Sequence, residues 1–137
     1  MKLTASSPTE IADCSIALSY VPSLNANGIT CRSDEGEHLA TLLFDFWTIN
    51  AVQMHMWIEK PKALDGGQLV RDAFNYVLKT GRELVIGVTP GDNTLSLRFQ
   101  HALGFIEKYR VVDGWAKGID MVISEKRLET EIKEEAA

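Results

Sequence analysis

Apolar and polar residues alternate from Ala51 to Glu59, and this alternation predicts a β-strand. Successive side chains of a strand point to opposite faces. The two predicted faces carry Val52, Met54, Met56 and Ile58 on one side and Gln53, His55, Trp57 and Glu59 on the other. We expect the first face to pack in the core. The second face mixes polar groups with an indole, so it is either solvated or part of a cleft.

In other stretches the apolar residues recur with a different spacing, which predicts further helices and strands. Apolar residues recur at helical spacing from Leu69 to Leu78, and Gly81 follows as a stop signal. The nearly continuous apolar run from Leu84 to Val88 is typical of a strand covered on both faces. Alternation from Ile119 to Ile123 predicts a last strand. Between these strands, residues 93–103 predict a helix whose core stripe is Leu95, Phe99, Ala102 and Leu103.

The remaining elements have weaker patterns. Residues 9–20 predict a first helix with Ile11, Ile16 and Ala17 on its apolar side. Strands are predicted at residues 29–32, 39–47 and 105–112, and Asp113-Gly114 is a turn signal. His38 falls in a turn, and residues 125–137 form a charged C-terminal tail.

This order of elements predicts an α/β fold with a mixed sheet. A strand, a helix and a strand in succession require a locally parallel pair, and the other strands are expected to be antiparallel with helices on the sheet faces. A chain of 137 residues is expected to form one domain, residues 1–137, and can bury a core without metals or disulfides.

Charge and composition narrow the function. A net charge of −5 argues against a general nucleic-acid or anionic-membrane binder. The sequence has no apolar run long enough to span a bilayer and nothing like a signal peptide, so we expect a cytoplasmic protein. His, Cys and Asp residues show no metal-ligand spacing, and no metal is expected. Cys14 and Cys31 have no catalytic neighbours and are interpreted as structural, although a disulfide between them stays open.

The most informative run is residues 88–105. A strand ends at Pro90, Asn93 opens a helix, Ser96 follows three residues later, and Leu103-Gly104-Phe105 closes it. This run resembles the second half of the coenzyme A site in GNAT-type N-acetyltransferases. Each residue also fits ordinary helix signals on its own, with Asn93 as N-cap and Gly104 as stop.

The resemblance implies a GNAT fold, in which the mixed sheet splays between its fourth and fifth strands, here residues 51–59 and 84–88. Acetyl-coenzyme A would lie in that opening, with its pyrophosphate on the loop of residues 60–67 and the following helix N-terminus. The implied contacts are Trp57, Ile58, Glu59, Lys62, Gly66, Gly67, Gln68, Asn93, Phe99 and Gln100.

The loop itself can be interpreted in two ways. Gly66 and Gly67 allow a backbone to approach an anion closely at a helix N-terminus. Alternatively, Asp65 caps the helix with its own carboxylate, which would occupy the N–H groups that a phosphate needs and would repel it. The family's usual glycine pattern is not met, because Asp65 stands where its first Gly belongs.

The implied reaction is direct attack of a primary amine, from a small molecule or a peptide, on acetyl-coenzyme A. Backbone N–H groups near residues 57–59 would polarise the thioester carbonyl. His55 is the first candidate base, Glu59 the second and Asp45 the third. His55 can also be a hydrogen-bonded structural imidazole. Trp115 and Tyr109 either line an acceptor pocket or pack in the core.

One departure from the family weakens the catalytic hypothesis. Many members have a Tyr that protonates the leaving thiolate seven residues after the Asn, where this chain has Gln100, and an amide is no acid. Arg98-Phe99 and residues 47–55 resemble a phage- and prophage-encoded subgroup. The alternatives to an enzyme are therefore a catalytically inactive phage or prophage structural or interaction protein, and a coenzyme A-binding regulatory module.

Overall fold

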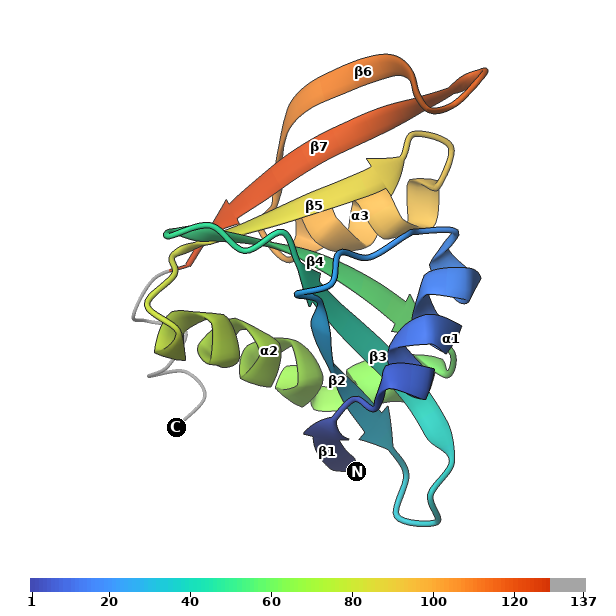
Figure 1. Cartoon of the computed structure of the whole chain (residues 1–137), viewed down its shortest axis with the longest axis vertical. Helices are drawn as coiled ribbons and strands as arrows, with labels where there is room; N and C mark the ends of the chain where they lie inside the picture. Colours follow the sequence, from blue (N-terminus) through green and yellow to red (C-terminus); the bar gives the residue numbers. More distant parts are fainter. Residues whose placement is uncertain (129–137) are drawn as a thin grey trace.

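The structure is a computed structural model that describes residues 1–128, and its elements form one sheet flanked by helices (Figure 1). The strands are β1 (Lys2–Ala5), β2 (Asn27–Arg32), β3 (His38–Asp45), β4 (Ala51–Ile58), β5 (Leu84–Pro90), β6 (Ile106–Ala116) and β7 (Ile119–Arg127). The helices are α1 (Pro8–Leu18), the 3-10 helix η1 (Pro61–Gly67), α2 (Gln68–Lys79) and α3 (Thr94–Ala102). Across the described residues the sheet order is β1-β2-β3-β4-β5-β7-β6.

The centre of the sheet is open. β4 and β5 form the parallel pair that the element order predicts, and their pairing covers only Ala51 with Leu84, Val52 with Val85, and Gln53 with Ile86. Beyond these pairs, β4 stays paired with β3, and β5 stays paired with β7. Figure 1 shows β4 and β5 diverging from that point. The predicted mixed sheet with splayed central strands is confirmed.

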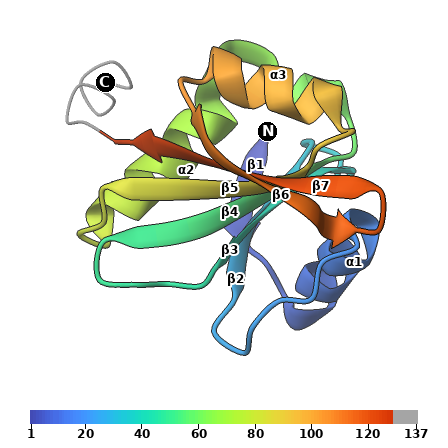
Figure 2. The same cartoon turned by 90° about the horizontal axis from the view of Figure 1, so that it is seen from above.

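Helices cover both faces of the sheet. Figure 2 shows α2 and α3 on one face and α1 on the other. Helix α2 buries a stripe at helical spacing that includes Leu69, Ala73 and Phe74, and this stripe packs in the core with Val52 and Met54 of β4. The apolar face predicted for β4 is therefore confirmed at its centre.

Two predicted apolar stripes are partly wrong. Leu95 is 76% exposed and Ile16 is 77% exposed, and Ala102 is also exposed. In α3 the buried side chain is Gln100, which is satisfied by hydrogen bonds, while Phe99 and Leu103 pack against the core cluster. In α1 the buried residue is Cys14. Side-chain polarity alone predicted the wrong buried residues in both helices. The inward positions are taken by the hydrogen-bonded amide of Gln100 and the thiol of Cys14.

Two boundaries near the C-terminus also differ from the prediction. Asp113 and Gly114 do not end a strand but lie within β6, where the pairing with β7 is irregular and Asp113 has φ of 57°. The Asp113 carboxylate accepts a hydrogen bond from the N–H of Gly118, which has φ of +83° and lies between β6 and β7. The predicted tail begins too early, since Glu125 pairs with Ile86 inside β7; residues 129–137 of that tail lie outside the described part of the chain.

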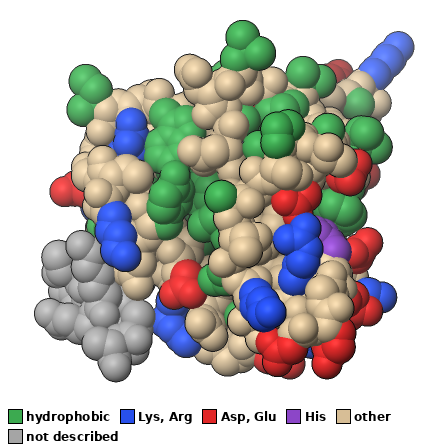
Figure 3. Space-filling view, turned by 60° about the horizontal axis from the view of Figure 1, so that its bottom comes forward, with side chains coloured by type: hydrophobic (Ala, Val, Ile, Leu, Met, Phe, Trp, Pro, Cys, Tyr) green, Lys and Arg blue, Asp and Glu red, His purple; other side chains and the backbone are tan. Residues whose placement is uncertain are grey.

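Strand β1 was not predicted, because it is a short edge strand with little buried surface and no apolar alternation. His38 begins β3 rather than lying in a turn. Cys14 and Cys31 are both buried free thiols, so the disulfide is not formed. Among residues 1–128, no helix combines the length and apolar character needed to cross a membrane. The face in Figure 3 carries both acidic and basic side chains beside hydrophobic ones.

Candidate active site

The opening between β4 and β5 holds a cavity of about 190 Å³. Its walls come from the middle of β4, the second half of β5, the inner face of α3 and the end of α1 with the residues after it. Its lining includes Leu18, Tyr20, His55, Asn93, Gln100, Phe105 and Trp115. Segments distant in the sequence therefore meet where the two central strands part.

His55 lies in this cavity and is only 7% exposed. Its Nε2 atom has no hydrogen-bond partner, and its ring stacks on Tyr20 with a centroid separation of 4.0 Å. Burial lowers the pKa of His55 to about 4, although the negative charge of Asp45 acts in the opposite direction. The structure shows no protein hydrogen-bond partner for His55 Nε2, whereas the alternative of a hydrogen-bonded structural imidazole would require one. His55 is a neutral imidazole at pH 7 that lines the cavity, and its Nε2 atom is buried without a protein hydrogen-bond partner.

Asp45, the third candidate base, is buried beneath the cavity wall. Its carboxylate accepts hydrogen bonds from the Tyr20 hydroxyl (2.8 Å), the Ser23 N–H (2.8 Å), the Ser23 hydroxyl and the Phe46 N–H (2.8 Å). Burial by itself would raise the pKa of Asp45, but these hydrogen bonds outweigh it and hold that pKa below its usual value. Burial and the bond to Asp45 raise the pKa of Tyr20. Asp45 therefore fixes the Tyr20 ring beside His55.

Gln100 stands where the family resemblance places a Tyr, and it has a full set of partners. Its amide nitrogen donates to the Thr89 hydroxyl (2.7 Å) and the Ser96 hydroxyl (3.2 Å), and its oxygen accepts from the Ser124 hydroxyl (2.7 Å). A Cβ on Gly87 would lie 2.8 Å from that oxygen, so a glycine is needed for this close approach. Gln100 thus ties α3 to β5 and β7 at the cavity wall.

Asn93 combines a structural and a site position. It is the N-cap of α3, and its side-chain oxygen accepts a hydrogen bond from the Ser96 N–H at 3.1 Å. It also lines the cavity. The ordinary N-cap interpretation is therefore confirmed, and it is compatible with a site position because the cap lies at the open end of the two strands.

The start of α2 has the backbone geometry of an anion site. Gly66 and Gly67 both have φ of +71°, and Gly67 caps α2 with no side-chain hydrogen bond. The alternative interpretation, in which Asp65 caps this helix, is wrong, because Gly67 is the N-cap and Asp65 lies in η1 with an extended ψ of 131°. Helix N-termini offer N–H donors and the positive end of the helix dipole to an anion.

A second cavity, of about 400 Å³, lies between α2 and α3 and joins two predicted cofactor residues, Gly67 and Phe99. Arg71 and Lys126 also line it, and no acidic residue does so within residues 1–128. Arg71 donates a hydrogen bond to the Gly66 carbonyl at 2.7 Å and covers Gly67. Sequence reasoning missed Arg71; the available signal was a cation one turn after the Gly-Gly pair.

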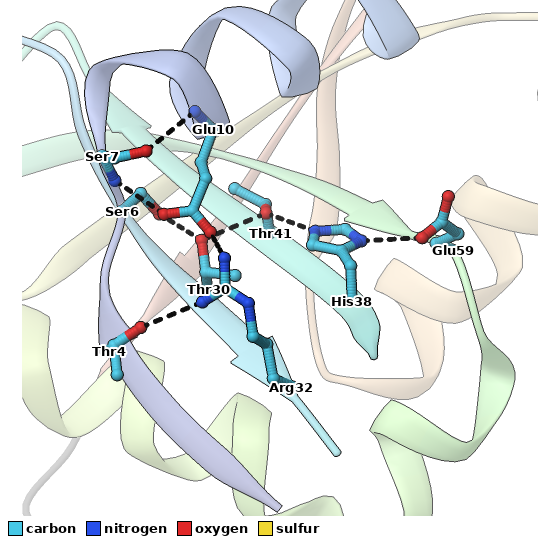
Figure 4. A network of polar contacts seen from close by, with 9 residues as sticks. All are labelled: Thr4, Ser6, Ser7, Glu10, Thr30, Arg32, His38, Thr41 and Glu59. Carbon is cyan, nitrogen blue, oxygen red and sulfur yellow. Dashed lines mark hydrogen bonds and ion pairs between the residues drawn. The ribbon is translucent and has the colours of Figure 1, made fainter. Parts of the chain in front are cut away.

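Other predicted site residues lie outside both cavities. The Glu59 carboxylate lies 2.9 Å from His38 Nδ1 and forms a hydrogen bond with it (Figure 4). The His38 ring stacks on the Trp57 ring with a centroid separation of 4.6 Å. Lys62 pairs with Glu37 at 3.1 Å. Ile58 packs against the core, and Gln68 is exposed in the first turn of α2. The structure does not bring Glu59 together with His55. Trp115 lines the first cavity, whereas Tyr109 is exposed on β6.

The His38–Glu59 pair belongs to a polar network that anchors α1 (Figure 4). From His38 Nε2, hydrogen bonds run to Thr41 (2.8 Å), from Thr41 to Thr30 (3.3 Å) and from Thr30 to Ser6 (2.7 Å). Helix α1 starts at a capping box formed by Ser7 and Glu10, and Glu10 also pairs with Arg32 of β2. This network holds the N-terminal end of α1 on the sheet, which positions its other end at the cavity.

A mixed sheet that opens between two central strands, with a helix N-terminus after the fourth strand, is the architecture that the resemblance to GNAT-type N-acetyltransferases implies. The solved structures that resemble the chain include a spermidine/spermine N-acetyltransferase from Vibrio cholerae (9% identity, TM-score 0.76, covering 97% of this chain and 95% of that chain). Another is an aminoglycoside 6'-N-acetyltransferase solved with coenzyme A (13% identity, TM-score 0.70, 93% and 97% covered). A third is an inferred GNAT-family acetyltransferase from Desulfovibrio desulfuricans (12% identity, TM-score 0.72, 93% and 100% covered).

The sequence matches no protein-family profile and no curated protein. Structural similarity at such low sequence identity shows a shared fold and does not by itself show a shared activity. The chain therefore has the GNAT acetyltransferase fold over nearly its whole length, as the sequence resemblance implied.

Proposed function

We propose that this protein is an acetyl-coenzyme A-dependent N-acetyltransferase. The observation that carries the proposal is the early separation of β4 and β5, which pair over three residues and then leave a cavity between them. On the α2 side of the sheet, the glycine-started helix and its basic cavity provide a place for a phosphate-bearing arm. On the α1 side, His55 and Tyr20 provide a place for the acceptor.

The residues around the second cavity fit coenzyme A. The backbone at Gly66, Gly67 and Gln68, together with Arg71, would bind the pyrophosphate, because the N-terminus of α2 offers N–H donors and the Arg71 guanidinium lies close to Gly67. Phe99 and Asn93 would contact the pantetheine arm, since they line the second and first cavities respectively. The charges agree with this assignment, because the second cavity has two cations and no carboxylate among its described lining residues.

The thioester supplies an activated acetyl group, and the chain's residues would orient the attack. The amine nitrogen uses its lone pair to form a bond to the carbonyl carbon, the carbon–sulfur bond breaks, and the amine loses one proton while the sulfur gains one. Backbone groups of β4 after Gln53 have no strand partner on the β5 side, so their N–H groups can polarise the thioester carbonyl. The imidazole of His55, which lines the cavity, would accept the proton from the nitrogen as it becomes acidic during bond formation.

Gln100 has no proton to give as an acid, so the thiolate would leave unassisted and take its proton from water. A thiol pKa of about 8.5 makes a thiolate a good leaving group near neutral pH. Gln100 also supports a second candidate function, a catalytically inactive coenzyme A-binding or interaction protein, including the phage- or prophage-type protein suggested by the sequence. Its amide groups are all committed to structural hydrogen bonds.

Two measurements test the proposal. Acetyl-coenzyme A at a hundred times its dissociation constant should raise the free energy of unfolding by about 2.7 kcal/mol, and a thiol reagent should detect coenzyme A release when an amine is added. Arg71→Ala should weaken this binding at least tenfold, whereas Arg98→Ala, an exposed cation on α3, serves as the matched control. No stabilisation at millimolar acetyl-coenzyme A would refute the enzyme; stabilisation without release from any amine would favour the inactive candidate.

A further inference from the structure

The cavity between β4 and β5 is uncharged. None of the residues that line it within residues 1–128 is Asp, Glu, Lys or Arg, although 24% of the chain is charged. Its polar groups are hydroxyls, amides and one imidazole, contributed by residues such as Thr89, Asn93 and His55. The carboxylate beside it, Asp45, already accepts four hydrogen bonds and does not line the cavity.

The same cavity is rich in aromatic rings. Tyr20, His55, Phe105 and Trp115 reach it from four separate segments of the chain. Tyr20 and His55 stack on each other, and the Asp45 hydrogen bond fixes the Tyr20 hydroxyl. Flat rings held in place in this way are suited to packing against another flat ring.

An uncharged cavity selects against cationic amines. An alkyl amine with a pKa of about 10.4 is neutral in only about one molecule in 2,500 at pH 7. Its ammonium form would lose water on entry and find no carboxylate to replace it, which is unfavourable. An aromatic amine is neutral at this pH, because its nitrogen lone pair is delocalised into the ring, and it enters without that cost.

Resting on the proposed acetyltransferase function, we infer that the acceptor is a small aromatic amine that is uncharged at neutral pH. Its ring packs among Tyr20, Phe105 and Trp115, and its nitrogen lies beside His55. The nitrogen lone pair forms the amide bond to the acetyl carbon and the nitrogen gives one proton to His55. The carbon–sulfur bond breaks, and coenzyme A leaves as the thiolate, which takes up one proton from water. The low pKa of His55 agrees with this acceptor class, since a weakly basic imidazole suits a weakly basic nucleophile.

Three probe amines separate charge from aromaticity: p-anisidine is aromatic and neutral, phenethylamine is aromatic and cationic, and spermidine is cationic only. Coenzyme A release at pH 7 should give a kcat/KM for p-anisidine at least a hundredfold above that for spermidine, with phenethylamine between them. A kcat/KM for spermidine equal to or above that for p-anisidine overturns the inference and leaves the acetyltransferase function intact.

Substitutions in the cavity wall also test the preference for an uncharged aromatic acceptor. Leu18→Asp places a carboxylate on the wall and should raise the ratio of spermidine to p-anisidine turnover at least tenfold. Trp115→Ala should raise the KM for p-anisidine at least tenfold, and Val112→Ala, an exposed position on the same strand, should leave it unchanged. Equal KM values in Trp115→Ala and Val112→Ala overturn the inference.

Acetyl-coenzyme A binding, measured first by thermal stability, distinguishes failure of the acceptor assignment from failure of the proposed acetyltransferase function. If acetyl-coenzyme A stabilises the protein but p-anisidine is not acetylated, the inference is wrong, whichever other amine reacts. If acetyl-coenzyme A gives no stabilisation, the proposed function fails and the acceptor assignment fails with it.

Discussion

Replacing His55 by Gln should remove a pH dependence of stability that the buried imidazole creates. In the folded protein burial lowers the pKa of His55 from 6.5 to about 4. The unfolded chain therefore binds the proton first as the pH falls, and acid shifts the equilibrium toward unfolding. The stabilisation is complete above pH 6.5 and is lost as the pH falls toward 4.

The expected size follows from that difference. A shift of about 2.5 pKa units, at about 1.36 kcal/mol per unit, corresponds to a loss of about 3 kcal/mol between pH 7 and pH 4. The wild-type protein should lose this amount in addition to whatever loss its carboxylates cause. His55→Gln retains the carboxylates and should lose only their share.

Urea unfolding followed by tryptophan fluorescence at pH 7, 6, 5 and 4.5 gives the free energy of unfolding by linear extrapolation. The difference between wild type and His55→Gln should change by about 2 kcal/mol or more over this range. His101→Gln, at an exposed position on α3, controls for loss of a histidine as such. Parallel pH profiles for wild type and His55→Gln would refute the assignment of His55 as a buried neutral imidazole.

Three other outcomes can be measured directly. Gly67→Ala should weaken acetyl-coenzyme A binding at least tenfold in a thermal titration, because the new Cβ displaces Arg71, whereas Gly36→Ala, with a similar positive φ and open space around it, should leave affinity unchanged. Gln100→Ala should lower the free energy of unfolding by about 1–3 kcal/mol in urea, because it leaves buried hydroxyl partners unsatisfied; a loss below 0.5 kcal/mol would contradict this role. Cys14, whose pKa burial raises to about 11, should react with Ellman's reagent only after unfolding, and fast labelling of the native protein would show that its pocket opens.

The elements that the sequence predicted well are those where one face is apolar without interruption. The alternation in β4 and the helical spacing in α2 both follow from burial against the same core, so the pattern and the structure coincide. The splay between β4 and β5 followed from the family resemblance rather than from periodicity. It depends on where hydrogen bonding stops, and no residue at Gln53 or Ile86 marks that point.

The candidate site was predicted less well, because polar side chains choose their partners through the fold. His55 was selected from its place on β4, but its depressed pKa comes from burial in the fold, and the Tyr20 ring that stacks on it comes from the loop after α1. Glu59 looked equivalent to His55 on the same predicted face, yet the end of β4 lies beside His38. Arg71 was hidden inside an amphipathic helix pattern and is brought to the glycine pair only by the first turn of α2.

Because β4 and β5 pair over only three residues, the sheet consists of two halves, β1–β4 and β5-β7-β6, that are joined at one end. Helix α2 packs in the same core cluster as Val52 and Val85 of this pairing. Its Phe74 ring packs against the Phe105 ring at a centroid separation of 6.3 Å, and Phe105 also lines the cavity between β4 and β5. The packing of Phe74 therefore reaches a residue that lines the cavity. We expect a smaller side chain at Phe74 to let Phe105 move and so to change the width of the cavity, although Phe74 itself does not line it.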